Sequence, residues 1–530
     1  MTVTAEKSSE KFHAEVTQRR ARDICIFAKE WDKLAILEIE GSEPSTASFR
    51  YSGIDSTVQS VRQGDPSLPF PSGCFDVVFV NGSISSTHLG EIHRVLRDGG
   101  EMILGITNRF LNTNVKMLKK TGFVPVQVFS VVPKLKNPLY WIDLLDSRPL
   151  RFLMKNLPGQ GRKMPVLRRL AFVLCRVISF LRLDRPGILR WLGSDFVMVA
   201  KKKGTTHGEG GLAKVARRIL SLLPHEQLAF LVHSGLESIT ILVFHKTSKP
   251  VAVLKMARDS TDTSLGRQHH ILSHLAAQGS PNFLGTIPRT LGWHPVNGVP
   301  AFAASFLEGR RVRLGTKTPM GKVEKYVSDI RNWLAELSRI PVPEGIAISN
   351  RFGEAKIRIR RLARKFAVGS TSPVLKALEQ MEDCNNQKLA LYVPVIVTHR
   401  DLGFENILWN QGELRVIDWG NSHYGFPLTD WMRFIGYFLS ELEGGRDFSV
   451  LCRALFSGKH RLSKVFYRET KQLCQESRVP LEWVVPLVLL GLFDFLEGFH
   501  YYQPDDWEER FAFVFADDGW VDKLNVSLFS

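Results

Sequence analysis

Four polar residues in the C-terminal half of the chain have types and a spacing that suit phosphoryl transfer. His399 and Asp401 follow an apolar run, Asn406 comes after four intervening residues, and Asp418 ends a second short apolar run. Phosphoryl transfer needs a carboxylate that orients the attacking hydroxyl and accepts its proton, and oxygen ligands that hold Mg²⁺ against the nucleotide phosphates. Asp401 suits the first role, and Asn406 with Asp418 suits the second.

The alternative interpretation is that these are ordinary loop residues, with Asp401 in a turn, Asn406 as a cap and Asp418 as a surface acid. The flanking sequence argues against it, because apolar runs of strand length stand before and after the loop, at 395–397, 407–409 and 416–417. We interpret His399 as a structural residue, together with His233 and His245.

The segment 399–406, with IDWG at 417–420, resembles the HxDxxxxN loop and following metal motif of aminoglycoside phosphotransferases and related small-molecule kinases. The resemblance covers roughly residues 212–518 and implies a protein-kinase-like fold. It further implies an ATP- and Mg²⁺-dependent phosphotransferase acting on a hydroxyl of a small molecule or sugar-linked acceptor. Asp401 would be catalytic, and Asn406 and Asp418 would bind the metal.

Two neighbouring positions extend this resemblance. PLTDWMRF follows at the family's distance, and the acid matching Asp430 supports the catalytic loop in that family. The family usually has glycine where Arg400 stands here, a departure that we expect to alter the edge of the loop and not its metal chemistry.

Upstream residues match the nucleotide-binding part of the same family. Lys255 in PVAVLKMA fits the third-strand lysine that holds the α- and β-phosphates, and the turn with Ser234 and Gly235 fits a phosphate-covering loop. The helical glutamate that usually pairs with the lysine is Gln268 here, which supplies no charge. A pseudokinase-like binding protein is therefore the alternative, and retention of the three loop residues favours catalysis.

Local patterns predict the elements that carry these residues. Strands are expected at 227–232, 238–245, 251–257 and 302–306, with a helix over 266–278. Helical patterns dominate from Thr316 onward, apart from a strand-loop-strand at 392–418. We predict an α+β bilobal kinase-like domain, with an N-lobe over 212–310 and a C-lobe over 311–530.

The N-terminal part is predicted to form a separate α/β domain over 15–203. Its expected strands are 24–27, 34–39, FDVVFV, EMILGI and DFVMVA, and a helix between the third and fourth is expected to stop at Gly99-Gly100. Alternating strands and helices predict a doubly wound, mostly parallel Rossmann-type sheet. Residues 204–211, GTTHGEGG, are expected to be a linker.

Segments 64–84 and 93–104 of this domain resemble class I S-adenosylmethionine-dependent methyltransferases. The resemblance implies that Asp65 contacts the adenine of the cofactor and that Asp55 is a remnant of the ribose-binding acid. The glycine-rich turn that lets backbone approach the cofactor is reduced to Gly41, and 41–65 is short for the usual helix and strand. We predict a non-catalytic scaffold, with a bifunctional methyltransferase and kinase as the alternative.

The composition excludes several protein classes. The chain has 530 residues, of which 44% are hydrophobic and 23% charged, so we expect a folded protein of several domains. The six cysteines are dispersed without a CxxC pair, which argues against a zinc ribbon or a disulfide scaffold and favours the cytoplasm. The polar N-terminus does not resemble a secretory signal, and the apolar runs at 170–181 and 479–492 are too short to span a membrane.

The net charge of +17 is concentrated in one segment. Residues 148–203 hold fourteen Lys or Arg against two acids, a net charge of +12. Within this segment 164–183 is a candidate basic amphipathic helix. We expect an ordinary surface helix, with peripheral binding to an anionic membrane as the alternative. Nucleic acid is not favoured, because no recognition motif accompanies the charge.

Overall fold

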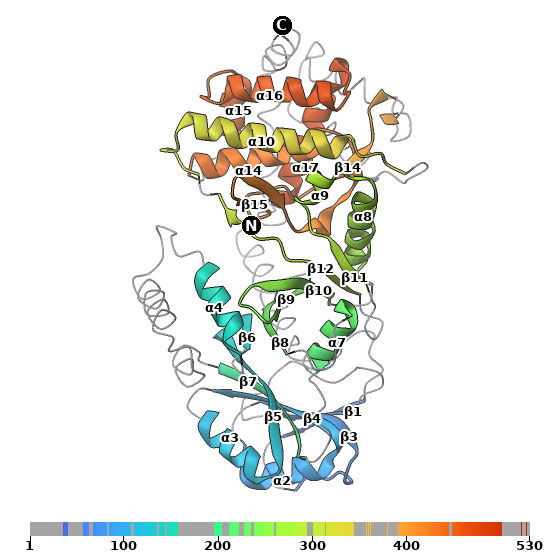
Figure 1. Cartoon of the computed structure of the whole chain (residues 1–530), viewed down its shortest axis with the longest axis vertical. Coiled ribbons are helices and arrows are strands. Elements are labelled where there is room, and N and C mark those ends of the chain that lie inside the picture. The colour runs from blue at the N-terminus through green and yellow to red at the C-terminus, as the bar shows by residue number, and fades with distance from the viewer. Residues whose placement is uncertain are drawn as a thin grey trace. The chain divides into compact units, whose positions relative to one another are not determined.

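The structure is a computed structural model that describes residues 35–40, 57–62, 67–81, 84–107, 111–134, 137–143, 146–156, 195–203, 211–221, 227–234, 238–258, 261–293, 300–312, 314–343, 392–444, 448–500 and the isolated positions 357, 359, 361, 379, 389, 390, 521 and 526. The chain divides into two compact units (Figure 1). The first holds residues up to Gly266 and Thr290–Phe306, and the second holds Arg267–Arg289 and the chain from Leu307.

The first unit is built around one twelve-stranded sheet with the order β11-β12-β10-β9-β8-β6-β5-β7-β4-β3-β1-β2. Its strands are β1 Ala35–Glu40, β2 Thr57–Arg62, β3 Phe75–Asn81, β4 Leu96–Thr107, β5 Phe123–Lys134, β6 Asn137–Asp143, β7 Asp195–Lys202, β8 Leu228–Ser234, β9 Ser238–His245, β10 Pro250–Ala257, β11 Thr290–Trp293 and β12 Ala301–Ser305. The helices are α2 Ser86–Val95, α3 Leu111–Lys120, α4 Ser147–Asn156 and α7 Gly211–Leu220.

One end of this sheet is parallel, as the sequence pattern predicts. β1 pairs in parallel with β2 and β3, and β3 pairs in parallel with β4. β7 then pairs antiparallel with both β4 and β5, so the sheet is mixed. The helix before β4 ends at Val95, because the chain enters the strand at Leu96. The predicted stop at Gly99-Gly100 is therefore wrong: these glycines lie within the strand, where Gly99 has a φ of 77°.

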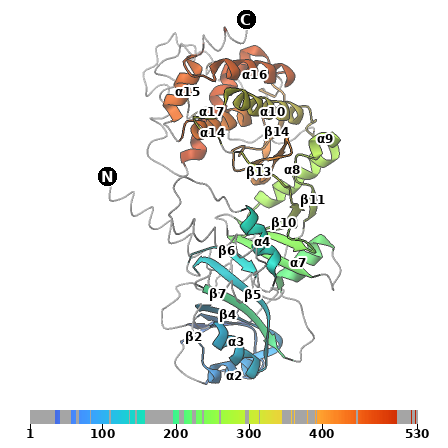
Figure 2. The same cartoon turned by 60° about the vertical axis from the view of Figure 1, so that its left-hand side comes forward.

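The sheet continues from strands of the predicted methyltransferase-like domain to strands of the predicted N-lobe. β6 and β8 pair antiparallel, with Tyr140, Trp141 and Ile142 opposite His233, Val232 and Leu231 respectively. Helix α4 contacts both strands, as the two views show (Figure 2). The strands on the two sides of 204–211 thus share one hydrogen-bonded sheet.

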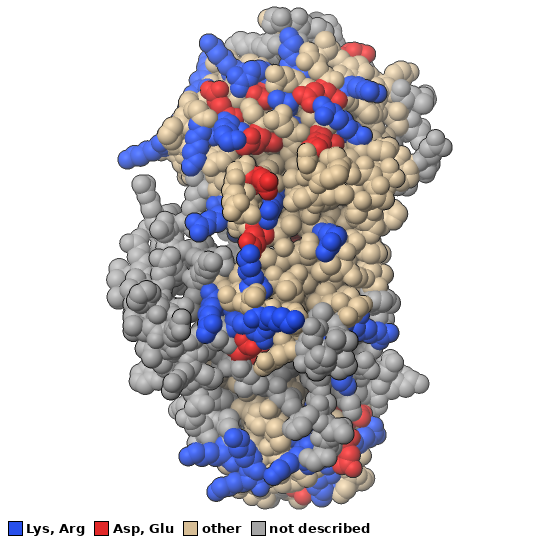
Figure 3. All heavy atoms as spheres, viewed as in Figure 1, with Lys and Arg blue, Asp and Glu red and all other residues tan. Residues whose placement is uncertain are grey.

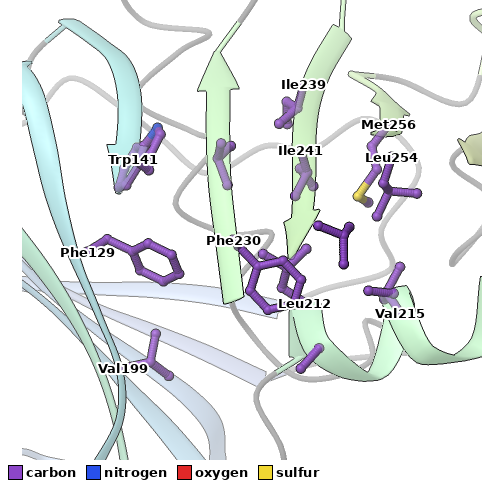
Figure 4. Packing of buried hydrophobic residues seen from close by; sticks show 14 of the residues in the cluster. Phe129, Trp141, Val199, Leu212, Val215, Phe230, Ile239, Ile241, Leu254 and Met256 are labelled. Carbon is purple, nitrogen blue, oxygen red and sulfur yellow. The ribbon is translucent and has the colours of Figure 1, made fainter. Parts of the chain in front are cut away.

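Alternation of apolar side chains along the strands gives this sheet a hydrophobic core on each face. On one face, helix α7 packs against a cluster that runs from Phe129 and Trp141 to Phe230 and Leu254 (Figure 4). On the other face, α2 contributes Leu89, Ile92 and Val95 to a second buried cluster. The continuous clusters indicate that burial of apolar surface, together with the β6–β8 hydrogen bonds, joins the two halves of the sheet.

The second unit is mainly helical. Its elements are α8 Ser264–Gln278, which begins at the end of the first unit, α9 Pro281–Leu284, α10 Met320–Ser338, α14 Thr429–Leu442, α15 Phe448–Phe456, α16 Ser463–Glu476 and α17 Val484–His500, with the short 3₁₀ helices η3 Trp419–Asn421 and η4 Leu481–Trp483. Short strands make two small sheets: β13 Arg310–Arg311, β15 Ile407–Asn410 and β16 Glu413–Val416 in one, and β14 Ile396–Thr398 with β17 His423–Gly425 in the other.

Helices α14 and α17 pack closely because each has a glycine at the contact. A Cβ atom on Gly436 of α14 would lie 2.6 Å from the ring of Phe495, and one on Gly491 of α17 would lie 2.8 Å from the Cβ of Met432. A larger side chain at either position would force the facing side chain or one of the helices to move. The two glycines therefore permit the short distance between α14 and α17.

Charge is unevenly distributed on the described surface. Lys and Arg side chains gather where α2 and α3 lie in the first unit (Figure 3), and Arg97, Lys116, Lys119 and Lys120 are among the exposed residues there. The basic segment 164–183 lies outside the described residues. Among the helices that the structure describes, none has the length and apolar character needed to cross a membrane.

Candidate active site

The loop 399–406 connects β14 to β15 and is anchored at its start by Asp430, in the first turn of α14. The N–H groups of His399 and Arg400 donate to the two carboxylate oxygens of Asp430, each at 2.6 Å. Asp430 is buried, so these charge-assisted bonds have little competition from water. They fix the peptide that leads directly into Asp401.

The candidate base and one candidate metal ligand contact each other. The side-chain nitrogen of Asn406 donates to the main-chain oxygen of Asp401 at 2.8 Å and to its Oδ2 at 3.0 Å. The same loop is tightened by hydrogen bonds from Gly403 N to Asp401 O and from Asn406 N to Gly403 O. Because the amide nitrogen is committed to Asp401, the amide oxygen of Asn406 is its remaining polar atom, of the kind that Mg²⁺ accepts as a ligand.

His399 links this loop to the segment before Asp418. Its Nε2 lies 2.9 Å from the carbonyl oxygen of Ile417, and its Nδ1 accepts a hydrogen bond from Asp401 N at 3.2 Å. An Nδ1 that accepts and an Nε2 that donates define a neutral imidazole. Burial lowers the pKa of His399, which agrees with that neutral form. The ring is thus a structural bridge, as interpreted from the sequence.

Asp418 is exposed and adopts a left-handed backbone conformation, with a φ of 64° and a ψ of 67°. The preceding N–H of Ile417 donates to Asn406 O at 2.9 Å. Ile417 therefore contacts both His399 and Asn406, and Asp418 follows directly after it. The structure brings Asp401, Asn406 and the start of the Asp418 segment into one hydrogen-bonded cluster.

Aromatic packing on α14 and η3 supports the cluster. A Cβ on Gly403 would lie 3.1 Å from the ring of Tyr437, so a larger residue would require this ring to shift. The Phe404 ring stacks on Phe438 with centroids 5.7 Å apart, and Trp419 contacts the His399 ring at 4.9 Å. A loop held by backbone anchors and by packed rings keeps its polar groups oriented before substrate arrives.

Oxygen atoms of the kind that hard cations such as Mg²⁺ prefer are present on two residues of this region. They are the oxygens of Asn406 and Asp418, and Mg²⁺ is usually bound by one or two protein oxygens together with phosphates and water. Among the residues that the structure describes, no three His, Cys, Asp or Glu side chains gather as a metal site of their own. The residues therefore suit a metal that arrives with a nucleotide.

The predicted nucleotide-binding residues lie apart from this cluster in the chain. Lys255 is in the middle of β10, in the first unit, where it is half-buried and aligned with Thr240 of β9 and Phe302 of β12. Ser234 ends β8, and Gly235 lies outside the described residues. The structure confirms a lysine on a central strand, and its role stays a prediction.

The helix α8 carries the position of the missing glutamate. Gln268 is buried, and its Oε1 has no hydrogen-bond partner among the described residues. The neighbouring Arg267 donates from Nη2 to the carbonyl oxygen of Gly420 at 3.3 Å, directly beyond Asp418 and Trp419. The end of the IDWG segment is thus attached to α8 through an arginine.

Asp65, Asp55 and Gly41, which the methyltransferase resemblance singles out, all lie outside the described residues. The segment that follows Asp65 is well anchored. Arg94 of α2 donates to Phe70 O at 2.7 Å and Leu68 O at 3.0 Å, and Glu91 accepts from Leu68 N at 3.0 Å. The hydrogen bond from Arg94, followed by that from Leu68 N, lowers the pKa of Glu91 to about 2.

Sequence reasoning missed Arg433 and Asp494, whose side chains meet beneath the loop. Both are charged residues within largely apolar helical segments, WMRFIGYFL and LGLFDFLEGF. An isolated charge at such a place is rarely buried without a partner, and this was the signal available in the sequence.

Comparisons with known proteins agree with both family resemblances. Residues 232–464 match the model described as phosphotransferase enzyme family, and residues 24–104 match the model described as methyltransferase domain. No curated protein matches the chain. The recognition of the two families from the sequence is therefore confirmed.

Several solved structures are similar to the chain. They include a protein of Ralstonia eutropha described as an aminoglycoside phosphotransferase, which is 13% identical, with 59% of this chain and 97% of that chain covered and a TM-score of 0.39. An aminoglycoside phosphotransferase in ternary complex with streptomycin and ATP is 15% identical, with 61% and 97% covered and a TM-score of 0.34. A choline kinase of Cryptosporidium parvum is 14% identical, with 60% and 93% covered and a TM-score of 0.34.

Proposed function

We propose that this chain, whose C-terminal part contains a phosphotransferase-family domain, transfers the γ-phosphoryl group of ATP to a hydroxyl of a small molecule or sugar-containing acceptor. The observation that carries the proposal is the pair of bonds from Asn406 to Asp401. This contact fixes a carboxylate beside an amide oxygen in a loop that is anchored by buried hydrogen bonds. Such an arrangement suits a reaction that depends mainly on positioning and charge stabilisation.

In the proposed reaction, the acceptor oxygen attacks the γ-phosphorus while the bond from that phosphorus to the bridging oxygen of ADP breaks. Asp401 orients the acceptor hydroxyl and takes its proton. Asn406 and Asp418 would hold Mg²⁺, which neutralises negative charge on the phosphates when bound. Lys255 would hold the α- and β-phosphates, and Ser234 and Gly235 would cover them. Retention of the loop residues favours catalysis over the alternative of a pseudokinase-like binding protein.

For the N-terminal part we propose a scaffold and not a working methyltransferase. The family match at 24–104 and the parallel strands β1 to β4 support the fold. The proposal that this domain is not catalytic rests on the sequence, in which the glycine-rich turn is reduced to Gly41 and the segment 41–65 is short. The alternative is a bifunctional enzyme that binds S-adenosylmethionine through Asp65.

We further propose a cytoplasmic protein, with 164–183 as the element that would attach it peripherally to an anionic membrane if the acceptor is carried on a lipid. Basic residues near an anionic surface contribute about 1 kcal/mol each. Co-sedimentation with anionic vesicles at low salt tests this idea. Wild type should sediment with the vesicles, and a variant with arginines 168, 169, 176 and 182 changed to glutamine should not. If both proteins stayed in the supernatant, the idea would be refuted.

The test of the main proposal is Mg²⁺-dependent ATP turnover, measured with water and with a panel of hydroxyl compounds as acceptors. Asp401→Asn should keep Mg·ATP affinity while turnover falls about 10²-fold or more, because general-base positioning contributes about 10²- to 10⁴-fold. Turnover at the wild-type rate in this variant would remove Asp401 from the mechanism. Binding of Mg·ATP without turnover in the wild type would favour the pseudokinase alternative.

A further inference from the structure

Asp494 of α17 binds two arginine side chains beneath the candidate catalytic loop. Arg400 donates from Nη2 to Asp494 Oδ1, and Arg433 of α14 donates from Nη2 to Asp494 Oδ2 at 2.9 Å. Arg433 also donates to the main-chain oxygen of Asp494 at 2.9 Å. The side chains of Arg400, Arg433 and Asp494 are only 9%, 10% and 15% exposed, so this is a largely buried charge cluster.

Arg400 has a backbone conformation that its side chain does not favour. Its φ is 61°, in the left-handed region where the Cβ of an L-residue crowds the backbone and glycine does not. Its N–H is held by Asp430 and its guanidinium is held by Asp494. Arg400 is therefore anchored at both ends, directly before Asp401.

The two guanidinium groups depend on the charge of Asp494. Burial would raise the pKa of Asp494, but Arg433 and Arg400 outweigh burial and hold it below its ordinary value. Burial would likewise lower the pKa of Arg433, and the charge and hydrogen bond of Asp494 raise it instead. Removing one partner from such a cluster leaves buried charge without compensation, which is strongly unfavourable.

We propose that Asp494 is a positioning residue for Asp401. Through Arg400 it holds residue 400 in the left-handed conformation that sets Asp401 against Asn406, and through Arg433 it ties the helix that carries Asp430 to α17. This inference rests on the proposed phosphotransfer function, because it assigns Asp494 to the same site.

Glu469 provides a matched control in the same unit. It is a buried carboxylate that accepts from Arg331 Nε at 3.0 Å and Arg468 Nε at 2.9 Å, and its contacts join α10 to α16. Both Asp494→Asn and Glu469→Gln remove one buried negative charge that faces two arginines. If Asp494 had only a structural role, the two variants should have equal kcat and equal hydrogen exchange of the loop.

The experiment compares these variants in the full chain with Mg·ATP as the probe. Turnover and KM for ATP are measured, together with hydrogen exchange of peptides covering 396–410. Asp494→Asn should lower kcat about tenfold or more with KM for ATP changed less than about threefold, and should speed exchange of the loop about tenfold. Glu469→Gln should change neither. Equal kcat and equal loop exchange in the two variants would overturn the proposal.

Two further variants keep the test decisive. Arg400→Met leaves Asp494 paired with Arg433, so it should fold even if Asp494→Asn does not, and it should still speed exchange of the loop. Unchanged exchange in Arg400→Met would overturn the proposal. Adding Arg400→Gly to Asp494→Asn should slow loop exchange again about threefold or more, because glycine adopts a positive φ without an anchor.

Exchange also separates this inference from the function on which it rests. Absence of ATP turnover in the wild type would refute the proposed function, whereas loop exchange would still decide whether Asp494 holds the loop. Slower turnover in Asp494→Asn without faster loop exchange would refute positioning and leave phosphotransfer standing.

Discussion

Asp430→Asn should loosen the candidate catalytic loop without unfolding the chain. The carboxylate accepts two buried N–H groups at 2.6 Å, from His399 and Arg400. An amide has one acceptor oxygen, so one N–H would face an NH₂ group and lose its partner. A hydrogen bond to a charged group contributes about 1.5–3 kcal/mol, and the bond that survives becomes neutral and weaker, so we expect a loss of about 2–4 kcal/mol.

The assay is urea unfolding of the second unit, monitored by tryptophan fluorescence. Turnover of Mg·ATP is measured in parallel. A local loss of about 3 kcal/mol lowers the equilibrium ratio of ordered to open loop about a hundredfold. Turnover should fall as well, because it requires the ordered loop. Asp329→Asn is the control, because Asp329 makes an exposed pair with Lys325 at 3.0 Å, worth less than about 1 kcal/mol. If Asp430→Asn and Asp329→Asn lost equal stability and kept equal turnover, the reasoning would be refuted.

Three further predictions concern the metal, the cofactor and acid stability. Asp418→Ala should abolish Mg²⁺-dependent ATP binding in isothermal titration, with Asn406→Ala milder; unchanged affinity in Asp418→Ala would make the IDWG segment only a turn. S-adenosylmethionine should not bind at micromolar concentration, and saturable binding that Asp65→Ala weakens would promote the bifunctional alternative. Glu91 has a folded pKa of about 2 against an ordinary 4.5, so its stabilisation is complete above about pH 4.5 and lost as the pH falls toward 2. Glu91→Gln should therefore flatten that part of the acid-unfolding profile, and an unchanged profile would show that the Arg94 contact does not act on stability.

The contacts within the candidate catalytic loop join residues that are close in the sequence. Asp401 and Asn406 are joined by hydrogen bonds over five positions, and such a spacing can be read along the chain. The anchor at Asp494 is 94 positions from Arg400, and no local pattern indicates which buried acid an arginine will find. The acid that holds the guanidinium of Arg400 lies on α17, far from the loop in the sequence.

The same distinction holds for the fold. Strand β9 has the predicted bounds of 238–245, and buried side chains alternate with less buried ones along most of its length. Strands β5 and β6 were not predicted, although together they provide the link between the two halves of the large sheet. Their partners, β7 and β8, lie more than sixty residues further along the chain. Pairing at such a separation is decided by tertiary burial and not by local propensity.

The β6–β8 pairing has a consequence for synthesis on the ribosome. Every strand from β1 to β7 precedes β8 in the chain, so the first seven strands can assemble before β8 emerges. Domains generally fold in the order of their synthesis, and β6 would then offer an open edge onto which β8 adds as a templated strand. A shortened protein that starts at Gly211 would lack this template and would expose the edge of β8 instead. Exposed strand edges promote aggregation, so we expect the part from Gly211 onward to need the preceding strands for soluble expression.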